Sequence, residues 1–351
     1  MTSMLTGFLS ECIDNKDFSC ASYVIGNSNG VIESNSLGHL YWGGPKVEDD
    51  SLYDLASVTK PIAVLPLMCA LEEGKICLED TVDLFLEEYR NTDKAKITLR
   101  QLLTHTSGLP GQQPNFQVCK TANEMKKSVR ELHFANKPDT KVEYSSQGFM
   151  ILGDIIEAIE KKTLDLVLKE KVFNPLNMDH TFFNPVPSII SKCVATEDCI
   201  WRGKIVRGQV HDENSVVLGG VTGHAGLFST LADLSKLCQA MLQAHKRDFS
   251  CFLKSSTVNL MSKNHTKHLN LARGLGWQGK DKHNSPIGDY FSPQSYGHTG
   301  FTGTSIWIDP ETDGFAILLT NRVHPTRKND SIIRNRKVFH NLSYLQIKSN
   351  E

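Results

Sequence analysis

β-type sequence at both ends of the chain, with a long helical stretch between, constrains the fold more than any other feature. Two short β-type runs flank NSNG at residues 27–30, which is the pattern of a hairpin. Such runs return in SYGHTG, GTSIWIDP and GFAILLTNR, within residues 295–322. From about residue 60 to residue 260 the spacing is largely helical. Distant strands can share one sheet, so we predict an antiparallel sheet built from both ends.

The two chain ends also carry helical patterns, TSMLTGFLSECI and DSIIRNRKVFHNLSYLQI, which we expect to cover this sheet. The predicted class is α/β (α+β), an antiparallel sheet flanked by helices with an inserted helical lobe. We expect one unit over residues 1–351. Its α/β lobe would take residues 1–56 plus 270–351, and its mainly helical lobe residues 57–269. A cleft between two lobes is the natural place for an active site.

Composition excludes several classes of protein. The net charge of −1 argues against nucleic acid and membrane surfaces as partners, and no apolar run reaches transmembrane length. The N-terminus lacks a basic start, a long apolar segment and a small-residue cleavage site, so we expect no secretory signal and a cytoplasmic location. The nine cysteines form no CxxC pair and are expected to be free thiols.

The single Ser-x-x-Lys in the chain, SVTK, places Ser57 and Lys60 at the start of a helical pattern. Pro61 in the first turn supports a helix start, and Pro66 predicts a kink farther along. Residues three apart share a helix face, so the hydroxyl and the ammonium would be neighbours. The helix N-terminus also favours an oxyanion, which suits an activated serine. Taken alone, the motif is more simply an N-cap serine beside a solvated lysine.

Tyr144, in VEYSSQGF, directly precedes another strong helical pattern. A phenol has a pKa of about 10 and acts as a base only where cations stabilise the phenolate. Lys60 would be a suitable cation. Taken alone, Tyr144 is more simply a tyrosine that packs a loop.

A third signal is YGHTGFTGTSIWIDP, which runs from residue 296 to residue 310. Its glycines would let a ligand approach the strand backbone closely. His298 and Thr299 would offer a titratable donor and a hydroxyl beside that ligand. Taken alone, this is a turn that leads into a strand.

Together and in this order, the three signals resemble the three-part signature of the serine β-lactamases and penicillin-binding proteins. The chain is most similar to the class C β-lactamase and D,D-peptidase branch, which includes esterases and D-amino-acid peptidases. The resemblance covers nearly the whole chain. It also rests on four segments: ITLRQLLTHTSGLP, VHDENSVVLGGVTGHAGLFST, GLGW and GHTGFTGTSIWIDP.

The resemblance implies a role for each matching residue. Ser57 would be the nucleophile, with Lys60 and Tyr144 as the groups that deprotonate it, and Tyr144 would later protonate the leaving group. The backbone N–H groups of Ser57 and Phe301 would form the oxyanion hole. The implied substrate-binding residues are Ser146, His298, Thr299, Gly300 and Phe301. No metal and no organic cofactor is implied.

Two positions depart from the family pattern. Ser146 stands where an asparagine is common, and His298 stands where many relatives have lysine. A histidine can be neutral at pH 7, so a substrate carboxylate need not be held there. From these two positions we expect short-chain aryl esters to turn over faster than β-lactams.

The predicted function is a serine hydrolase that cleaves an ester or amide through an acyl-enzyme on Ser57. Its partner would be a small-molecule ester, amide or β-lactam. The alternatives are a non-catalytic penicillin- or peptide-binding protein of the same fold, and an acyltransferase. The sequence leaves open the oligomeric state and the roles of His211, Asp212 and His224.

Other motifs are weak. GLGWQG matches GxGxxG in spelling but opens no βαβ unit, and no GxSxG or HExxH is present. His265 and His268 are too sparse for a zinc site.

Overall fold

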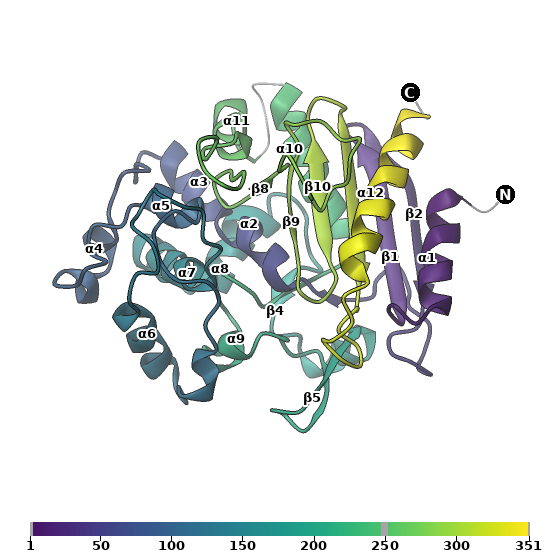
Figure 1. The fold of residues 1–351 in the computed structure, drawn as a ribbon, viewed down its shortest axis with the longest axis horizontal. Helices are drawn as coiled ribbons and strands as arrows, with labels where there is room; N and C mark the ends of the chain where they lie inside the picture. The colour runs from purple at the N-terminus through teal and green to yellow at the C-terminus, as the bar shows by residue number, and fades with distance from the viewer. Residues whose placement is uncertain (1–2, 247–251, 350–351) are drawn as a thin grey trace.

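A six-stranded antiparallel sheet with the order β2-β1-β11-β10-β9-β8 forms the centre of the molecule in the computed structural model, which describes residues 3–246 and 252–349 (Figure 1). The strands are β1 (Cys20–Asn27), β2 (Gly30–Gly38), β8 (Gln278–Gly279), β9 (Tyr296–Thr299), β10 (Ser305–Asp309) and β11 (Gly314–Thr320). β1 pairs with β2 in the predicted hairpin and with β11 from the other chain end. The prediction of one antiparallel sheet built from both ends is therefore confirmed.

Helices cover both faces of this sheet. α1 (Met4–Asp14) and α12 (Ile332–Lys348) lie together on one face, and α10 (Leu231–Lys246) lies on the other (Figure 1). Ala316 and Leu318 of β11 join the apolar cluster under α1 and α12, while Phe315 and Ile317 join the main core on the α10 side. Every residue of β11 is buried, because a strand covered on both faces has no solvated side.

The other α-helices lie between residues 59 and 262, and most of them are short. They are α2 (Thr59–Ala63), α3 (Leu65–Glu72), α4 (Val82–Phe85), α5 (Leu99–Leu103), α6 (Ala122–Glu131), α7 (Ser146–Glu160), α8 (Leu164–Leu168), α9 (Glu213–Val217) and α11 (Ser255–Ser262). The pattern of buried positions on α7 places its apolar side in the main core. The division into two lobes at residues 56/57 and 269/270 stays a prediction, and α10 packs on the sheet although it lies between those boundaries.

The middle of the chain also contains short strands that the sequence did not indicate. β3 (Tyr53–Asp54), β7 (Leu227–Ser229) and β4 (Phe182–Phe183) form a small sheet, and β5 (Ala195–Cys199) pairs with β6 (Lys204–Arg207). Strands of two to five residues are too short to show a repeating pattern in the sequence. β3 matters for the site because it leads directly to Ser57.

The segment that follows Ser57 divides at Val64, where α2 ends and α3 begins. Pro66 falls in the first turn of α3, where its missing N–H costs no helical hydrogen bond. The kink predicted from Pro66 is therefore a break between two short helices.

Eight cysteines lie within the described residues, and none of these eight is in a disulfide; the ninth, Cys251, lies outside those residues. Burial raises the pKa of the Cys20 thiol to about 12, so this thiol is not ionised near neutral pH.

Across residues 3–246 and 252–349, every helix falls short of the length and apolar content that crossing a bilayer requires.

Candidate active site

Ser57 lies in a 3-10 turn, Ala56–Val58, between β3 and α2. The preceding residue, Ala56, has a φ of 47°, a left-handed conformation that costs about 1–2 kcal/mol for a residue other than glycine. The Asp54 carboxylate accepts a hydrogen bond from the Ala56 N–H at 2.8 Å and so helps to hold this turn. The hydroxyls of Thr302 and Thr304 donate to the carbonyls of Asp54 and Leu55, which ties the turn to the loop between β9 and β10.

Lys60 is fully buried, and its Nζ lies 3.1 Å from the Ser57 Oγ. The same Nζ donates to the backbone carbonyl of His224 at 3.1 Å. The rings of Tyr144 and Phe149 lie close by, with their centroids 4.9 Å and 5.8 Å from Nζ. Within the described part of the chain, Lys60 forms no ion pair with a carboxylate. The structure therefore places the serine, the lysine and the tyrosine of the first two motifs together.

His298, in β9, completes this group, with its ring centroid 6.0 Å from that of Tyr144. Its Nδ1 donates to the Thr299 carbonyl at 2.8 Å, which leaves Nε2 as the acceptor of the neutral ring. Burial and the nearby charge of Lys60 lower the pKa of His298 to about 3. His298 is thus neutral at pH 7 and supplies no positive charge to a substrate, in line with the expectation that a histidine at this position need not hold a carboxylate.

His105 lies on the other side of Tyr144, at 4.7 Å between ring centroids. Its Nδ1 accepts from the Ser145 N–H, which links the TSGLP loop to the start of α7. Burial, followed by the charges of Arg273 and Lys60, holds the pKa of His105 well below its usual value. Lys60 is therefore the cation that lies over the Tyr144 ring, and Arg273 lines the same cavity.

Two cavities meet at Ser57. One, of about 340 Å³, has Tyr144, His298, Thr299 and Gly300 in its wall, and the other, of about 290 Å³, extends toward α9. Ser57 and Phe301 line both cavities. A substrate whose reacting carbonyl sits at Ser57 could thus extend in two directions. Ser146, by contrast, is buried at the start of α7 and lines neither cavity.

Three arginines that the sequence analysis missed line the cavity on the His298 side. Arg273, Arg322 and Arg336 are mostly buried, and none of them pairs with a carboxylate within 4.0 Å among the described residues. Arg322 Nε donates to the Phe301 carbonyl at 2.8 Å, and Arg336 Nη2 donates to the Gly300 carbonyl at 2.8 Å. These two bonds hold the turn after β9, and the three guanidinium groups make this cavity cationic.

Sequence reasoning could not find these arginines, because they belong to three different elements or loops and share no spacing or motif. Burial, together with the charge of Arg322, lowers the pKa of Arg336 to about 9, which still leaves it charged at pH 7. Arg273 directly precedes GLGW, which is the one local signal that could have drawn attention to it.

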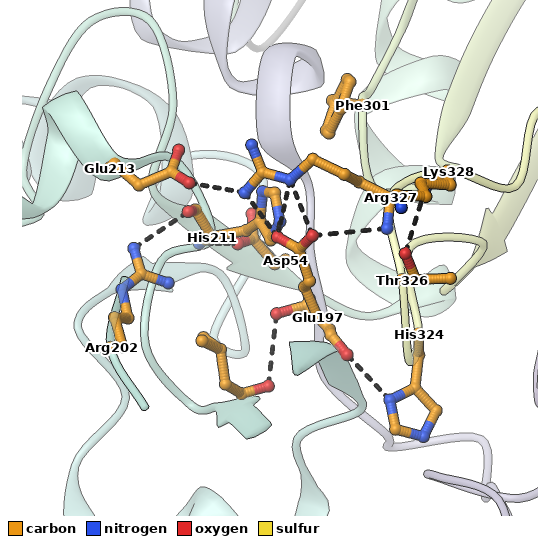
Figure 2. Close-up of polar contacts among 12 residues, drawn as sticks. Asp54, Glu197, Arg202, His211, Glu213, Phe301, His324, Thr326, Arg327 and Lys328 are labelled. Atoms are coloured by element: carbon orange, nitrogen blue, oxygen red, sulfur yellow. Dashed lines mark hydrogen bonds and ion pairs between the residues drawn. The ribbon is translucent and has the colours of Figure 1, made fainter. Parts of the chain in front are cut away.

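A cluster of charged side chains supports the other side of Phe301 (Figure 2). Arg327 Nε contacts the two Glu197 carboxylate oxygens at 2.7 and 2.8 Å, and Arg327 Nη2 contacts Glu213 at 2.5 Å. His211 Nε2 lies 3.0 Å from Glu197, and the His211 ring stacks on Phe301 at 5.6 Å. Phe301 is thus held between His211 and arginine side chains, in the loop that carries the third motif.

Asp54 connects this cluster to the turn at Ser57. Its second carboxylate oxygen accepts from the His211 N–H at 2.6 Å, while its first accepts from Ala56. Glu197, Cys199 and Glu213 lie close enough to share a cation, but the guanidinium of Arg327 already contacts both glutamates. We therefore describe this group as an ion-pair cluster.

Asp212 and His224 have partners of their own. His224 Nε2 lies 3.0 Å from the Asp212 carboxylate, and Nδ1 lies 2.9 Å from the Thr222 hydroxyl. Asp212 also caps α9 by accepting from the Ser215 N–H at 2.8 Å. Burial alone would raise the pKa of Asp212, but His224, this N–H group and Lys60 together lower it below its usual value. These contacts fix the loop that contains His224, whose carbonyl accepts a hydrogen bond from Lys60.

An antiparallel sheet flanked by helices, with a Ser-x-x-Lys pair whose lysine is buried beside a tyrosine, is typical of the class of active-site-serine hydrolases. The Beta-lactamase family profile matches residues 7–340, and the chain belongs to this family. It is 33% identical over 338 residues to a protein of Escherichia coli (strain K12) named "Putative D-alanyl-D-alanine carboxypeptidase". That match covers 84% of this chain and 77% of the relative.

Solved structures share the fold. The octameric penicillin-binding protein homologue from Pyrococcus abyssi has a TM-score of 0.76 at 20% identity, over 97% of this chain and 76% of that one. A hydrolase with promiscuous acyltransferase activity, EstCE1, has a TM-score of 0.75 at 20% identity, over 95% and 97% of the two chains. The protein is accordingly a serine hydrolase of the Beta-lactamase family.

Proposed function

We propose that Ser57 attacks the carbonyl carbon of an ester or amide, expels the alcohol or amine, and forms an acyl-enzyme that water then hydrolyses. The observation that carries this proposal is the 3.1 Å contact between the Ser57 Oγ and the Nζ of the buried Lys60. A serine hydroxyl is a weak nucleophile unless a neighbouring group takes its proton. Lys60, which contacts Ser57, and Tyr144, which lines the same cavity as Ser57, are the two side chains suited to that task.

We assign the base role to Tyr144, with Lys60 as the cation that stabilises its phenolate. The Tyr144 ring faces Nζ at 4.9 Å, and both neighbouring histidines have pKa values held below their usual range. In this assignment the Ser57 proton passes to the Tyr144 oxygen during attack. The same proton then goes to the leaving oxygen or nitrogen when the acyl-enzyme forms.

The developing oxyanion would be bound by the backbone N–H groups of Ser57 and Phe301. Both residues line both cavities, and each is held from behind by side chains. Asp54 supports the turn before Ser57, while Arg322 binds the Phe301 carbonyl. Rigid donors aimed at a developing charge stabilise it without reorganisation during the reaction.

For the substrate, we propose an ester or amide that carries a carboxylate on the side of the His298 cavity. Arg273, Arg322 and Arg336 supply positive charge there, opposed among the lining residues by Asp330 alone. A peptide ending in D-alanine, the substrate named for the Escherichia coli relative, has such a carboxylate. The expectation that esters outpace β-lactams relied on positions 146 and 298 and took no account of these arginines.

Intact mass spectrometry tests the assignment of Ser57. A serine-directed phosphonate should add one adduct, located on the peptide that contains Ser57, and Ser57→Ala should lose this adduct and about 10³-fold or more of kcat. A panel of aryl esters, D-amino-acid amides, D-alanyl-D-alanine peptides and β-lactams should then show turnover. An adduct on another residue would refute the assignment, and adducts without any turnover would identify a binding protein instead.

A further inference from the structure

A separate cavity lies away from Ser57, between α6, α7, α8 and the loop of residues 218–223. Its volume is about 410 Å³, and it shares no lining residue with the two cavities at Ser57. Sites for small molecules in proteins have volumes of about 300–1,000 Å³. This cavity is therefore large enough to hold a small organic ligand.

Apolar side chains make up much of its wall. Met125 and Val129 come from α6, Met150 and Ile151 from α7, and Leu218 from the loop. Methionine side chains are flexible and polarisable, so a wall that contains two of them can adapt to the shape of a ligand. The cavity thus suits the apolar part of a molecule.

Tyr89 provides a polar group that has no partner in the protein. It is 3% exposed and lines the cavity, yet its hydroxyl makes no hydrogen bond to any residue in the described part of the chain. The oxygen itself is not fully enclosed, so a molecule in the cavity can reach it. A ligand with a polar head could therefore form a hydrogen bond with this hydroxyl.

Acidic side chains give the cavity a negative charge. Asp154, Glu157 and Asp165 line it with three carboxylates, whereas Lys126 supplies one ammonium, which lies 2.7 Å from Asp154. Burial raises the pKa of Asp154 in spite of this contact. A further cation beside these carboxylates would reduce their mutual repulsion and the cost of burying Asp154 in its charged form.

The loop that closes this cavity also carries the partner of Lys60. Thr222 lines the cavity, its hydroxyl lies 2.9 Å from His224 Nδ1, and the His224 carbonyl accepts from Lys60 Nζ. Gly223 is packed tightly against α7, since a Cβ added there would lie 2.2 Å from the Phe149 carbonyl oxygen. A ligand that presses on this loop would therefore act on the residues that position Lys60.

We propose that this cavity is a second ligand site that takes an organic ammonium ion, a small apolar chain or ring bearing one positive charge. The apolar part would lie against Met125, Val129 and Ile151, and the ammonium would lie between Asp154 and the Tyr89 hydroxyl. Occupation of the site would reach Ser57 through Thr222 and His224. Binding at this site does not depend on whether Ser57 carries out the proposed reaction.

Three probes of similar size test the binding: hexylammonium, hexan-1-ol and hexanoate. Titration calorimetry on the Ser57→Ala variant avoids any acyl transfer to the amine. Hexylammonium should bind at least tenfold more tightly than hexan-1-ol, and hexanoate should bind more weakly than either. Equal affinities for the three probes would refute a cation site, whatever Ser57 does.

Variants locate the site. Asp154→Asn should weaken hexylammonium binding at least tenfold, and Val129→Phe should abolish it by filling the cavity. Glu131→Gln is the matched control, because Glu131 lies on the same helix as Val129, is largely exposed and does not line the cavity. Unchanged affinity in Asp154→Asn would overturn the proposal. If Val129→Phe does not fold, the comparison of Asp154→Asn with Glu131→Gln is sufficient to test the site.

The coupling between this cavity and Ser57 is tested by a separate measurement, the rate at which a phosphonate modifies Ser57. In the wild-type protein, saturating hexylammonium should change the rate at which a phosphonate modifies Ser57 by at least twofold. Val129→Phe should show no such change. An unchanged rate in the wild-type protein at saturation would refute the coupling through Thr222 and His224.

Discussion

Replacing Arg327 with methionine tests whether the ion-pair cluster behind Phe301 stabilises the protein. The substitution leaves Glu197 and Glu213, whose side chains are about one tenth exposed, without their guanidinium partner, and only Glu197 keeps the contact with the His211 ring (Figure 2). Breaking a fully buried pair by removing one partner costs about 3–5 kcal/mol. Arg327 is 39% exposed, so we expect a smaller loss in the free energy of unfolding, about 2 kcal/mol once solvent screening is counted.

The pKa of Glu197 supports this magnitude. Burial alone would raise it, but His211 and Arg327 lower it to about 2, from an ordinary value of 4.5. A shift of one pKa unit corresponds to about 1.4 kcal/mol, so this difference corresponds to about 3 kcal/mol of stability. His211 and Arg327 share this contribution. Because the folded-state pKa is depressed, this stability is fully present above pH 4.5 and is lost as the pH falls toward 2.

Urea denaturation of the wild-type and Arg327→Met proteins at pH 7 and at pH 3 measures the effect. The variant should lose about 2 kcal/mol at pH 7 and clearly less at pH 3, where part of the stability from Glu197 is already gone. Arg90→Met is the control, since the exposed Arg90–Glu87 pair has a similar 2.7 Å contact and should contribute under about 1 kcal/mol. Equal losses at both pH values, or a loss no larger than that of the control, would refute the reasoning.

Three further predictions concern the site and the cysteines. Tyr144→Phe should remove most activity and leave the melting temperature nearly unchanged, whereas a near-wild-type rate would assign the base role to Lys60. Arg273→Gln should raise KM about 10- to 100-fold for a substrate with a carboxylate, since a hydrogen bond to a charged group contributes about 1.5–3 kcal/mol. A neutral aryl ester should be unaffected, and equal effects on both substrates would argue against a carboxylate site. Thiol titration of the denatured, unreduced protein should find nine free thiols, and five or fewer would indicate disulfides.

Much of the fold and of the first-motif geometry could be predicted from the sequence, because the relevant signals are local. The hairpin at residues 27–30 and the terminal helices follow from turn chemistry and periodicity over a few residues. Ser57 and Lys60 are three residues apart at a helix start, so their contact follows from helix geometry. Tyr144 and His298 were found through their motifs, and the structure brings them to the same cavity.

Tertiary structure alone decided the electrostatics around Ser57. Arg273 precedes β8, Arg322 follows β11 and Arg336 lies in α12, so the three meet only in the folded protein and no local pattern marks them. The contact between Arg327 and Glu197 likewise joins residues 130 positions apart. Burial then sets the charge of each group, as at His298, because desolvation depends on what surrounds a side chain and not on its neighbours in the sequence.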